Sequence, residues 1–167
     1  MPQRRPIGLF TLLFFFIAPG TVAVLIPYWL TRWQPHNWYA ATIPARLAGL
    51  ALIAAGLAAL INSFYRFVTE GRGTPAPVMP PTELVVRGLY RYVRNPMYVV
   101  LLMIVIGEAL LLGRFILLGY ALALWVNFHL FVMLYEEPKL RRTFGRSYDD
   151  YRAAVPRWWP RRKPFKT

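Results

Sequence analysis

Four long apolar stretches alternate with shorter polar segments along this chain. They cover about residues 9–30, 47–67, 96–112 and 115–135. An α-helix needs roughly 20 apolar residues to cross the hydrocarbon core of a bilayer, with a range of about 17–25. The pattern therefore predicts an all-α integral membrane fold, with four transmembrane helices in a single membrane domain over residues 1–167.

The third and fourth stretches are predicted to form a helical hairpin. Between Tyr98 and Tyr135 charged residues occur only at Glu108 and Arg114, and Gly113-Arg114 divides the segment near its middle. A turn at this point returns the beginning and the end of the hairpin to the same membrane face. An ionisable group within a span is by default a functional hypothesis. For Glu108, however, we favour a position near the outer face, paired with Arg114.

The first stretch contains Pro19-Gly20 and follows Arg4-Arg5, which together resemble a signal peptide. The apolar run continues to Ile26, past any cleavage site, so a retained first helix is the favoured interpretation. Pro19-Gly20 then predicts a kink, or a pair of half-helices.

Composition supports a membrane protein and narrows its chemistry. The 167 residues are 57% hydrophobic and include no cysteine and two histidines, His36 and His129. Disulfides and thiolate nucleophiles are excluded, and neither a histidine-rich metal site nor a Ser-His hydrolase is expected. We expect no metal.

The basic residues predict the orientation. Of the 20 Lys and Arg residues, only Arg32, Arg46 and Arg114 lie at the predicted outer face, and the other 17 lie at the opposite face. Positive residues are enriched on the cytoplasmic side of membrane proteins. We therefore expect a multi-pass protein with both termini cytoplasmic, in the inner membrane if it is bacterial. Attraction to anionic lipids explains the net charge of +13 without nucleic acid.

Apolar residues recur at three- to four-residue spacing among basic residues after the fourth stretch. They are Leu140, Phe144, Tyr148, Tyr151 and Val155. This spacing predicts a cytoplasmic interfacial helical segment on the membrane surface. Gly145 is expected to divide it, and Ser147 and Asp150 to form a capping box for the second helix. Trp158-Trp159 is expected to sit at head-group level.

The beginning of the third stretch carries the first candidate chemistry. Asn95 is a good N-cap and Pro96 suits the first helical position. The free N–H groups of this helix end, beside Arg94, Arg91 and Arg87, attract a carboxylate or phosphate. For Arg87 and Arg91, anchoring at lipid phosphates is an equally good interpretation.

Glu136 and Glu137 form the second candidate, in a chain with only seven acidic residues. Carboxylates at a helix C-terminus face the negative end of the helix dipole, which is unfavourable, and such departures tend to mark function. The alternative is pairing with Lys139, Arg141 or Arg142 at the surface. Adjacent helical residues point about 100° apart, so at least one glutamate should face the bundle.

His129 shares a predicted helix face with Trp125 and Glu136, so it can line a pocket below the glutamates. A core histidine without a chemical role is the plainer interpretation of His129 alone.

The chain carries a resemblance over residues 82–160. The residues that carry it are Gly88-Leu89-Tyr90-Arg91-Tyr92-Val93-Arg94-Asn95-Pro96-Met97-Tyr98, the apolar hairpin, Glu136-Glu137-Pro138-Lys139-Leu140, Phe144-Gly145, Tyr148, Tyr151 and Pro156-Arg157. This segment resembles the core of the isoprenylcysteine carboxyl methyltransferase / phospholipid methyltransferase superfamily. Members are integral membrane enzymes that transfer a methyl group from S-adenosylmethionine, with a shared Arg-His-Pro-x-Tyr and Glu-Glu motif. Asn95 departs from the histidine of that motif, and Val100 stands where a small residue is common.

The resemblance implies S-adenosylmethionine as cofactor and a set of site residues. The cofactor-binding residues would be Gly88, Leu89, Tyr90, Asn95, Pro96, Tyr98, His129, Glu136 and Glu137, and the catalytic residues Arg94, Glu137 and Arg141. Arg94 suits the cofactor carboxylate, and one of the two glutamates suits the ammonium.

The expected partners are membrane lipids and a lipophilic methyl acceptor. An isoprenylcysteine carboxylate needs only a cation such as Arg141 or Arg142 to orient it. A phospholipid amine must first lose a proton, to a glutamate or His129. A different class, a non-enzymatic membrane scaffold or lipid-binding protein, also remains open.

Overall fold

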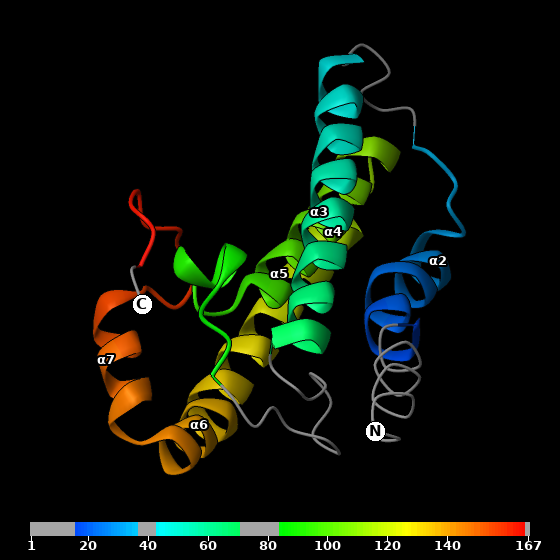
Figure 1. The fold of residues 1–167 in the computed structure, drawn as a ribbon. Helices are drawn as coiled ribbons and strands as arrows, with labels where there is room; N and C mark the ends of the chain where they lie inside the picture. Colours follow the sequence, from blue (N-terminus) through cyan, green and yellow to red (C-terminus); the bar gives the residue numbers. More distant parts are fainter. Residues whose placement is uncertain (1–15, 37–42, 71–83, 166–167) are drawn as a thin grey trace, which may run out of the picture.

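The computed structural model describes residues 16–36, 43–70 and 84–165. Within these ranges every regular element is helical, as predicted (Figure 1). In chain order the elements are η1 (Thr21–Leu25), α2 (Ile26–Thr31), α3 (Ile43–Glu70), η3 (Gly88–Arg91), α4 (Pro96–Leu112), α5 (Phe115–Phe131), η4 (Val132–Glu136), α6 (Glu137–Phe144) and α7 (Arg146–Ala154). Of these, η1 and η4 are π-helical and η3 is a 3₁₀ helix.

Two helices are long and apolar enough to cross a membrane. One is Ile43–Arg66, within α3, and the other is Phe115–Phe144, in which α5, η4 and α6 follow without a break. Phe16–Thr31 and Pro96–Leu112 are shorter apolar helices. All four predicted stretches are therefore helical where they are described, while residues 9–15 lie outside the described ranges. Four membrane crossings and their direction remain proposals.

The predicted hairpin of α4 and α5 is present. Pro96 is the first residue of α4, where a missing N–H costs nothing, and Gly113 ends the helix in the left-handed conformation with φ of 67°. The predicted pairing of Glu108 with Arg114 is wrong. Arg114 has extended backbone beyond the helix, and its Nε donates to the carbonyl of Gln34 at 2.9 Å. Glu108 Oε2 is buried and has no hydrogen-bond partner.

Both π-helical segments end two residues before a proline. η1 precedes Pro27, and η4 precedes Pro138. A proline inside a helix lacks an N–H and its ring clashes with the carbonyl four residues earlier, so a widened turn accommodates it. At Pro19-Gly20 the predicted half-helices are wrong, because Phe16–Thr31 is one helix that widens after Gly20.

Glycines bring α3 and α4 into close contact, side by side in Figure 1. A Cβ atom on Gly107 would lie 2.7 Å from the carbonyl oxygen of Gly49, and a Cβ on Gly56 would lie 2.7 Å from Cγ1 of Ile104. No side chain larger than hydrogen fits at these positions without a shift of the neighbouring atoms. The antiparallel pair of α3 and α4 is therefore the closely packed centre of the fold.

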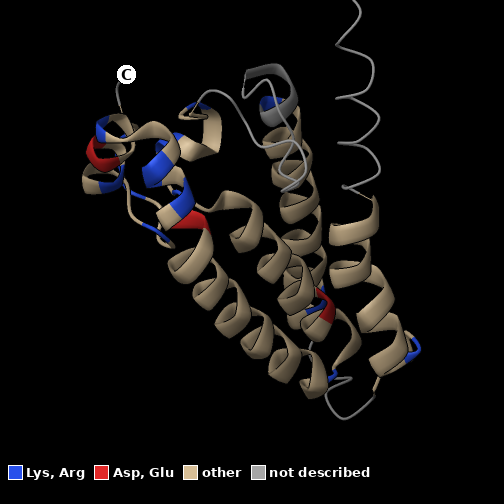
Figure 2. Cartoon of the chain, turned by 90° about the horizontal axis from the view of Figure 1, so that it is seen from below, with Lys and Arg blue, Asp and Glu red and all other residues tan. Residues whose placement is uncertain are grey.

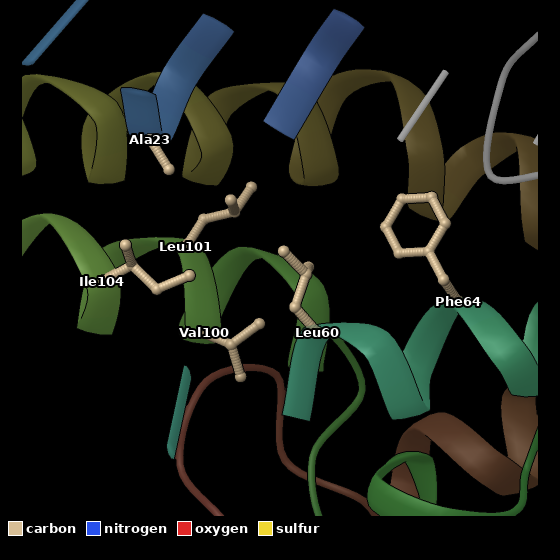
Figure 3. Packing of buried hydrophobic residues seen from close by; sticks show 6 residues of the cluster. All are labelled: Ala23, Leu60, Phe64, Val100, Leu101 and Ile104. Carbon is tan, nitrogen blue, oxygen red and sulfur yellow. The ribbon is translucent and has the colours of Figure 1, made fainter. Parts of the chain in front are cut away.

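One buried cluster joins the first helix to this pair. Leu60 and Phe64 of α3 point toward Val100, Leu101 and Ile104 of α4, and Ala23 of η1 covers them (Figure 3). A second cluster joins α4 to α5. It contains Val105, Ala109, Leu117 and Ala121. Removing this apolar surface from water would stabilise the bundle by about 25 cal/mol per Å² in a soluble protein; within a bilayer close packing replaces that term.

The apolar face of the last two helices packs against the protein itself. Tyr148, Tyr151 and Val155 are buried, with Leu84, Val86, Leu140, Phe144, Ala154 and Phe165 packed around them. This packing explains the three- to four-residue spacing without a membrane, and contact with the membrane surface stays a prediction.

Gly145 divides α6 from α7 as predicted, with φ of 53°. The predicted capping box of Ser147 and Asp150 is wrong. Helix α7 begins at Arg146 and has no side-chain cap, because its N-cap is Gly145, two residues before Ser147.

Candidate functional site

The charged residues of the described chain gather at one end of the molecule, around α6, α7 and the C-terminal tail, while the long helices are mostly uncharged (Figure 2). Arg94, two residues before α4, meets Glu137, the first residue of α6. Arg94 Nη1 lies 2.9 Å from Glu137 Oε1. The α4–α5 hairpin thus brings together two residues 43 positions apart.

Glu137 is the centre of a group of arginines. Arg157 donates through Nε to Oε1 at 2.6 Å and through Nη2 to Oε2 at 3.0 Å, and Arg152 Nε lies 4.0 Å from Oε2. The side chain of Glu137 is only 8% exposed. Burial by itself raises the pKa of Glu137, but the hydrogen bond from Arg157 and the positive charges of the arginines outweigh it and hold the pKa below 4.5. Glu137 is therefore a fixed carboxylate anion.

Glu136 has a different environment from its neighbour. The hydroxyl of Tyr98 donates to Glu136 Oε2 at 2.9 Å. Burial raises the pKa of Glu136 above 4.5, and the hydrogen bond from Tyr98 only partly offsets this effect. Both glutamates follow the apolar stretch that ends at Tyr135, yet Glu136 takes up a proton at higher pH than Glu137.

Arg94 retains an unused donor. Its side chain is 9% exposed, its Nη1 also reaches the hydroxyl of Tyr148 at 3.3 Å, and its Nε is buried without a hydrogen-bond partner. Buried polar groups are normally paired, so an unpaired guanidinium N–H in a charged site fits a ligand that supplies an acceptor. An anionic group of a bound molecule meets this requirement.

An aromatic group adjoins the glutamates. Trp158 Nε1 donates to His129 Nδ1 at 3.1 Å, and Trp125 stacks on the imidazole with 5.4 Å between ring centroids. Phe128 packs on Tyr98 at 4.7 Å between centroids. Because Nδ1 accepts a hydrogen bond, neutral His129 carries its proton on Nε2 and acts as a donor there.

The segment before α4 is fixed by backbone contacts. Gly88 has φ of 58°, and its missing side chain leaves room for Arg66. The carbonyl of Leu89 accepts from the N–H groups of Tyr92 and Val93, at 3.0 and 3.1 Å.

Helix α7 and the start of α4 complete this arrangement. The carbonyl of Tyr90 accepts from the hydroxyl of Tyr151 at 2.7 Å. Pro96 is fully buried. Residues 88–90 are thus held beside α7, next to the Glu137 group.

The predicted N-cap role of the Asn95 side chain is wrong. Asn95 makes no side-chain cap, and its Nδ2 donates to the carbonyl of Arg157 at 3.2 Å. The tail passes close to the beginning of α4 and offers this carbonyl to Nδ2, while Oδ1, the atom that would accept from a helix N–H, makes no cap hydrogen bond.

Arg141, predicted as catalytic, pairs with Asp149 in the structure. Its Nε lies 3.1 Å from Asp149 Oδ1, and its side chain is 62% exposed. A catalytic role for Arg141 therefore remains a proposal.

Three neighbours of the site were missed from the sequence as site residues: Tyr148, Arg157 and Trp158. Tyr148 and Arg157 both stood within the motif that carries the resemblance, and this was the available signal. Nothing in the spacing of the tail indicates that it folds back onto the beginning of α4.

Two comparisons with known proteins identify relatives of this chain. The profile of the phospholipid methyltransferase family matches residues 44–147. A segment of 74 residues is 42% identical to the Protein-S-isoprenylcysteine O-methyltransferase of Schizosaccharomyces pombe. That segment covers 44% of this chain and 31% of the yeast protein, so the chain corresponds to about a third of its relative. No solved structure matches.

Proposed function

We propose how this chain, which belongs to the phospholipid methyltransferase family, functions. It is a membrane methyltransferase that uses S-adenosylmethionine and a lipophilic acceptor. One observation carries the proposal. Within the segment that the family profile matches, Arg94 with its unpaired Nε and two glutamates in different environments meet at one end of the helices.

The residues present fit the polar part of the cofactor. Its methionine moiety carries a carboxylate, an ammonium and a sulfonium. The free Nε–H of Arg94 suits the carboxylate. Glu137 is already held by two arginines, so we assign the ammonium to Glu136, whose second oxygen remains available beside the Tyr98 contact.

When bound, S-adenosylmethionine supplies a methyl group on its sulfonium, which a lipid-borne nucleophile displaces from sulfur in one in-line step. The chain's own residues then align the two reactants and exclude water. The positive charge on sulfur disappears in the transition state, so a carboxylate held against sulfur would favour the ground state. Glu137, neutralised by Arg94 and Arg157, avoids this penalty.

We propose isoprenylcysteine-type carboxylate O-methylation as the reaction. The name of the Schizosaccharomyces pombe relative, an isoprenylcysteine O-methyltransferase, supports this acceptor. The donor state of His129 also supports it, because an Nε2–H can hydrogen-bond a carboxylate but cannot take a proton from an amine. The carboxylate is already ionised, so the reaction requires no proton transfer.

Phospholipid amine N-methylation is the second candidate. The description of the family favours it, and Glu136 supplies a possible base because burial raises its pKa. An amine would transfer its proton to Glu136 before or during the attack on the methyl group.

Ligand binding tests the cofactor assignment. Purified protein in detergent should bind S-adenosylmethionine and S-adenosylhomocysteine, as measured by isothermal titration calorimetry, and Glu136→Gln and Glu137→Gln should each weaken this binding. Unchanged affinity in both variants would remove the proposal.

A methyl-transfer assay tests the acceptor. Labelled methyl groups should enter the organic phase with a prenylated cysteine that has a free carboxylate. The matched methyl ester should accept none. Transfer to phosphatidylethanolamine instead would establish the second candidate.

A further inference from the structure

We propose that Arg157 is a positioning residue and that the C-terminal tail, residues 155–165, completes the site by placing its guanidinium on Glu137. This inference rests on the proposed function, because it assigns what the tail does for cofactor binding. The tail lies beyond residues 44–147, the segment that the family profile matches, and the role is argued here from the contacts of the tail.

The tail is held against the segment before α4 by backbone hydrogen bonds. The N–H of Arg94 donates to the carbonyl of Pro156, and the N–H of Arg161 donates to the carbonyl of Tyr92, both at 2.9 Å. The N–H of Phe165 donates to the carbonyl of Arg91, also at 2.9 Å. In Figure 1 the red tail lies beside the green segment of η3. The tail therefore has a fixed position relative to Arg94.

Side chains reinforce this arrangement on both sides of Arg157. Asn95 Nδ2 binds the carbonyl of Arg157, and Arg91 Nε binds the carbonyl of Phe165 at 2.6 Å. The next residue, Trp158, donates to His129. Two consecutive tail residues thus reach two separate parts of the site, the glutamate pair and the aromatic group.

The charges explain why a second arginine is needed. Glu137 and Arg94 alone would neutralise each other, and only the more distant Arg152, at 4.0 Å, would add positive charge to attract an anionic ligand. Arg157 occupies both oxygens of Glu137 in a bidentate contact, while Arg94 uses only Nη1 and keeps Nε unpaired. The three groups together carry one surplus positive charge. Arg157 thereby leaves Arg94 available for the cofactor carboxylate.

A double-mutant cycle tests this role through the affinity for S-adenosylhomocysteine. We expect Arg157→Gln to weaken binding by about 10- to 100-fold, which corresponds to about 1.4–2.8 kcal/mol. Arg157→Lys should weaken binding less than Arg157→Gln, because lysine keeps the positive charge but cannot make the bidentate contact with Glu137. In the Glu137→Gln background the same substitution should cost less than about threefold, because its target is gone. Arg162→Gln, an exposed arginine of the same tail, is the matched control.

Hydrogen exchange separates positioning from unfolding. The amides of Arg94 and Arg161 should stay protected in Arg157→Gln, since their backbone partners remain. An affinity for Arg157→Gln equal to that of Arg162→Gln would overturn the proposal, and so would an undiminished effect of Arg157→Gln in the Glu137→Gln background. Loss of protection at Arg94 would also overturn it, because the residue would then serve folding alone. If the wild-type protein binds neither ligand, the proposed function fails first and the positioning role fails with it.

Discussion

Glu137 and Glu108 are both carboxylates on the α4-to-α6 segment, yet their surroundings differ completely. Glu137 accepts hydrogen bonds from two arginines and has a third arginine at 4.0 Å. Glu108 lies inside α4 with a buried oxygen that has no partner. Removing a charge from water is costly unless partners compensate it. The fold therefore supplies charged hydrogen-bond partners to the carboxylate at the end that carries the proposed chemistry. It supplies none to the buried oxygen of Glu108.

The largest effect is expected from Glu137→Gln. The substitution leaves Arg94 and Arg157 without their shared anion, and breaking a buried ion pair in this way costs about 3–5 kcal/mol. We expect the unfolding temperature in detergent to fall and binding of S-adenosylhomocysteine to weaken by about 100-fold. Asp149→Asn, which removes an exposed ion pair with Arg141, should change both quantities little. Equal effects of the two substitutions on unfolding temperature and affinity would show that Glu137 matters no more than an exposed ion-pair residue.

Glu136→Gln should have the next largest effect, on binding alone. It removes one charge-assisted hydrogen bond to the ligand ammonium, which corresponds to about tenfold in affinity. The amide can still accept a hydrogen bond from Tyr98, so the unfolding temperature should stay close to that of the wild-type protein. Affinity equal to the wild type, measured by calorimetry, would move the ammonium to another residue.

Lowering the pH should protonate the two neighbouring glutamates at different pH values. Burial raises the pKa of Glu136 and the arginines lower that of Glu137, so Glu136 loses its negative charge first as the pH falls. Affinity for S-adenosylhomocysteine should therefore fall with an apparent pKa above 4.5, the ordinary value of the carboxyl.

Tyr98→Phe removes a hydrogen bond that lowers the pKa of Glu136. It should move this acid limb upward by about one pH unit, the equivalent of one hydrogen bond. A titration of affinity against pH in both proteins measures the shift. If the fall of affinity at low pH occurs at the same pH in both proteins, protonation of Glu136 does not control binding.

Glu108→Leu should have the smallest effect on binding and the opposite sign on stability. Replacing a buried polar group that has no partner by an apolar one relieves an uncompensated penalty of about 1–3 kcal/mol. We expect a higher unfolding temperature with unchanged affinity for S-adenosylhomocysteine. A loss of affinity would place Glu108 in the functional machinery after all.

The α4–α5 hairpin could be predicted from the sequence, whereas the contacts of the tail could not. The bounds of α4 were predicted as 96–112 because Pro96 and Gly113 mark its two ends unambiguously. The meeting of Arg94 with Glu137 followed from the length of the hairpin and its single turn. Both depend on local patterns and on a chain length that can be counted.

The contacts of the tail depend on no such pattern. The backbone of residues 155–165 pairs with the segment before α4, and backbone hydrogen bonds leave no mark in side-chain spacing. This explains why Asn95 was predicted to cap its own helix and instead binds the carbonyl of Arg157. It also explains why the contact of Trp158 with His129 was not predicted.

The close contact of α3 and α4 at Gly49 and Gly107 limits how a lipid-borne reactant can arrive. The two backbones leave no room for a side chain at these points, and therefore none for an acyl or prenyl chain. The interface between α3 and α4 is therefore closed at these two glycines. The proposed hydrophobic acceptor therefore cannot pass between α3 and α4 at Gly49 and Gly107, whereas Trp125 and Leu122 of α5 are exposed.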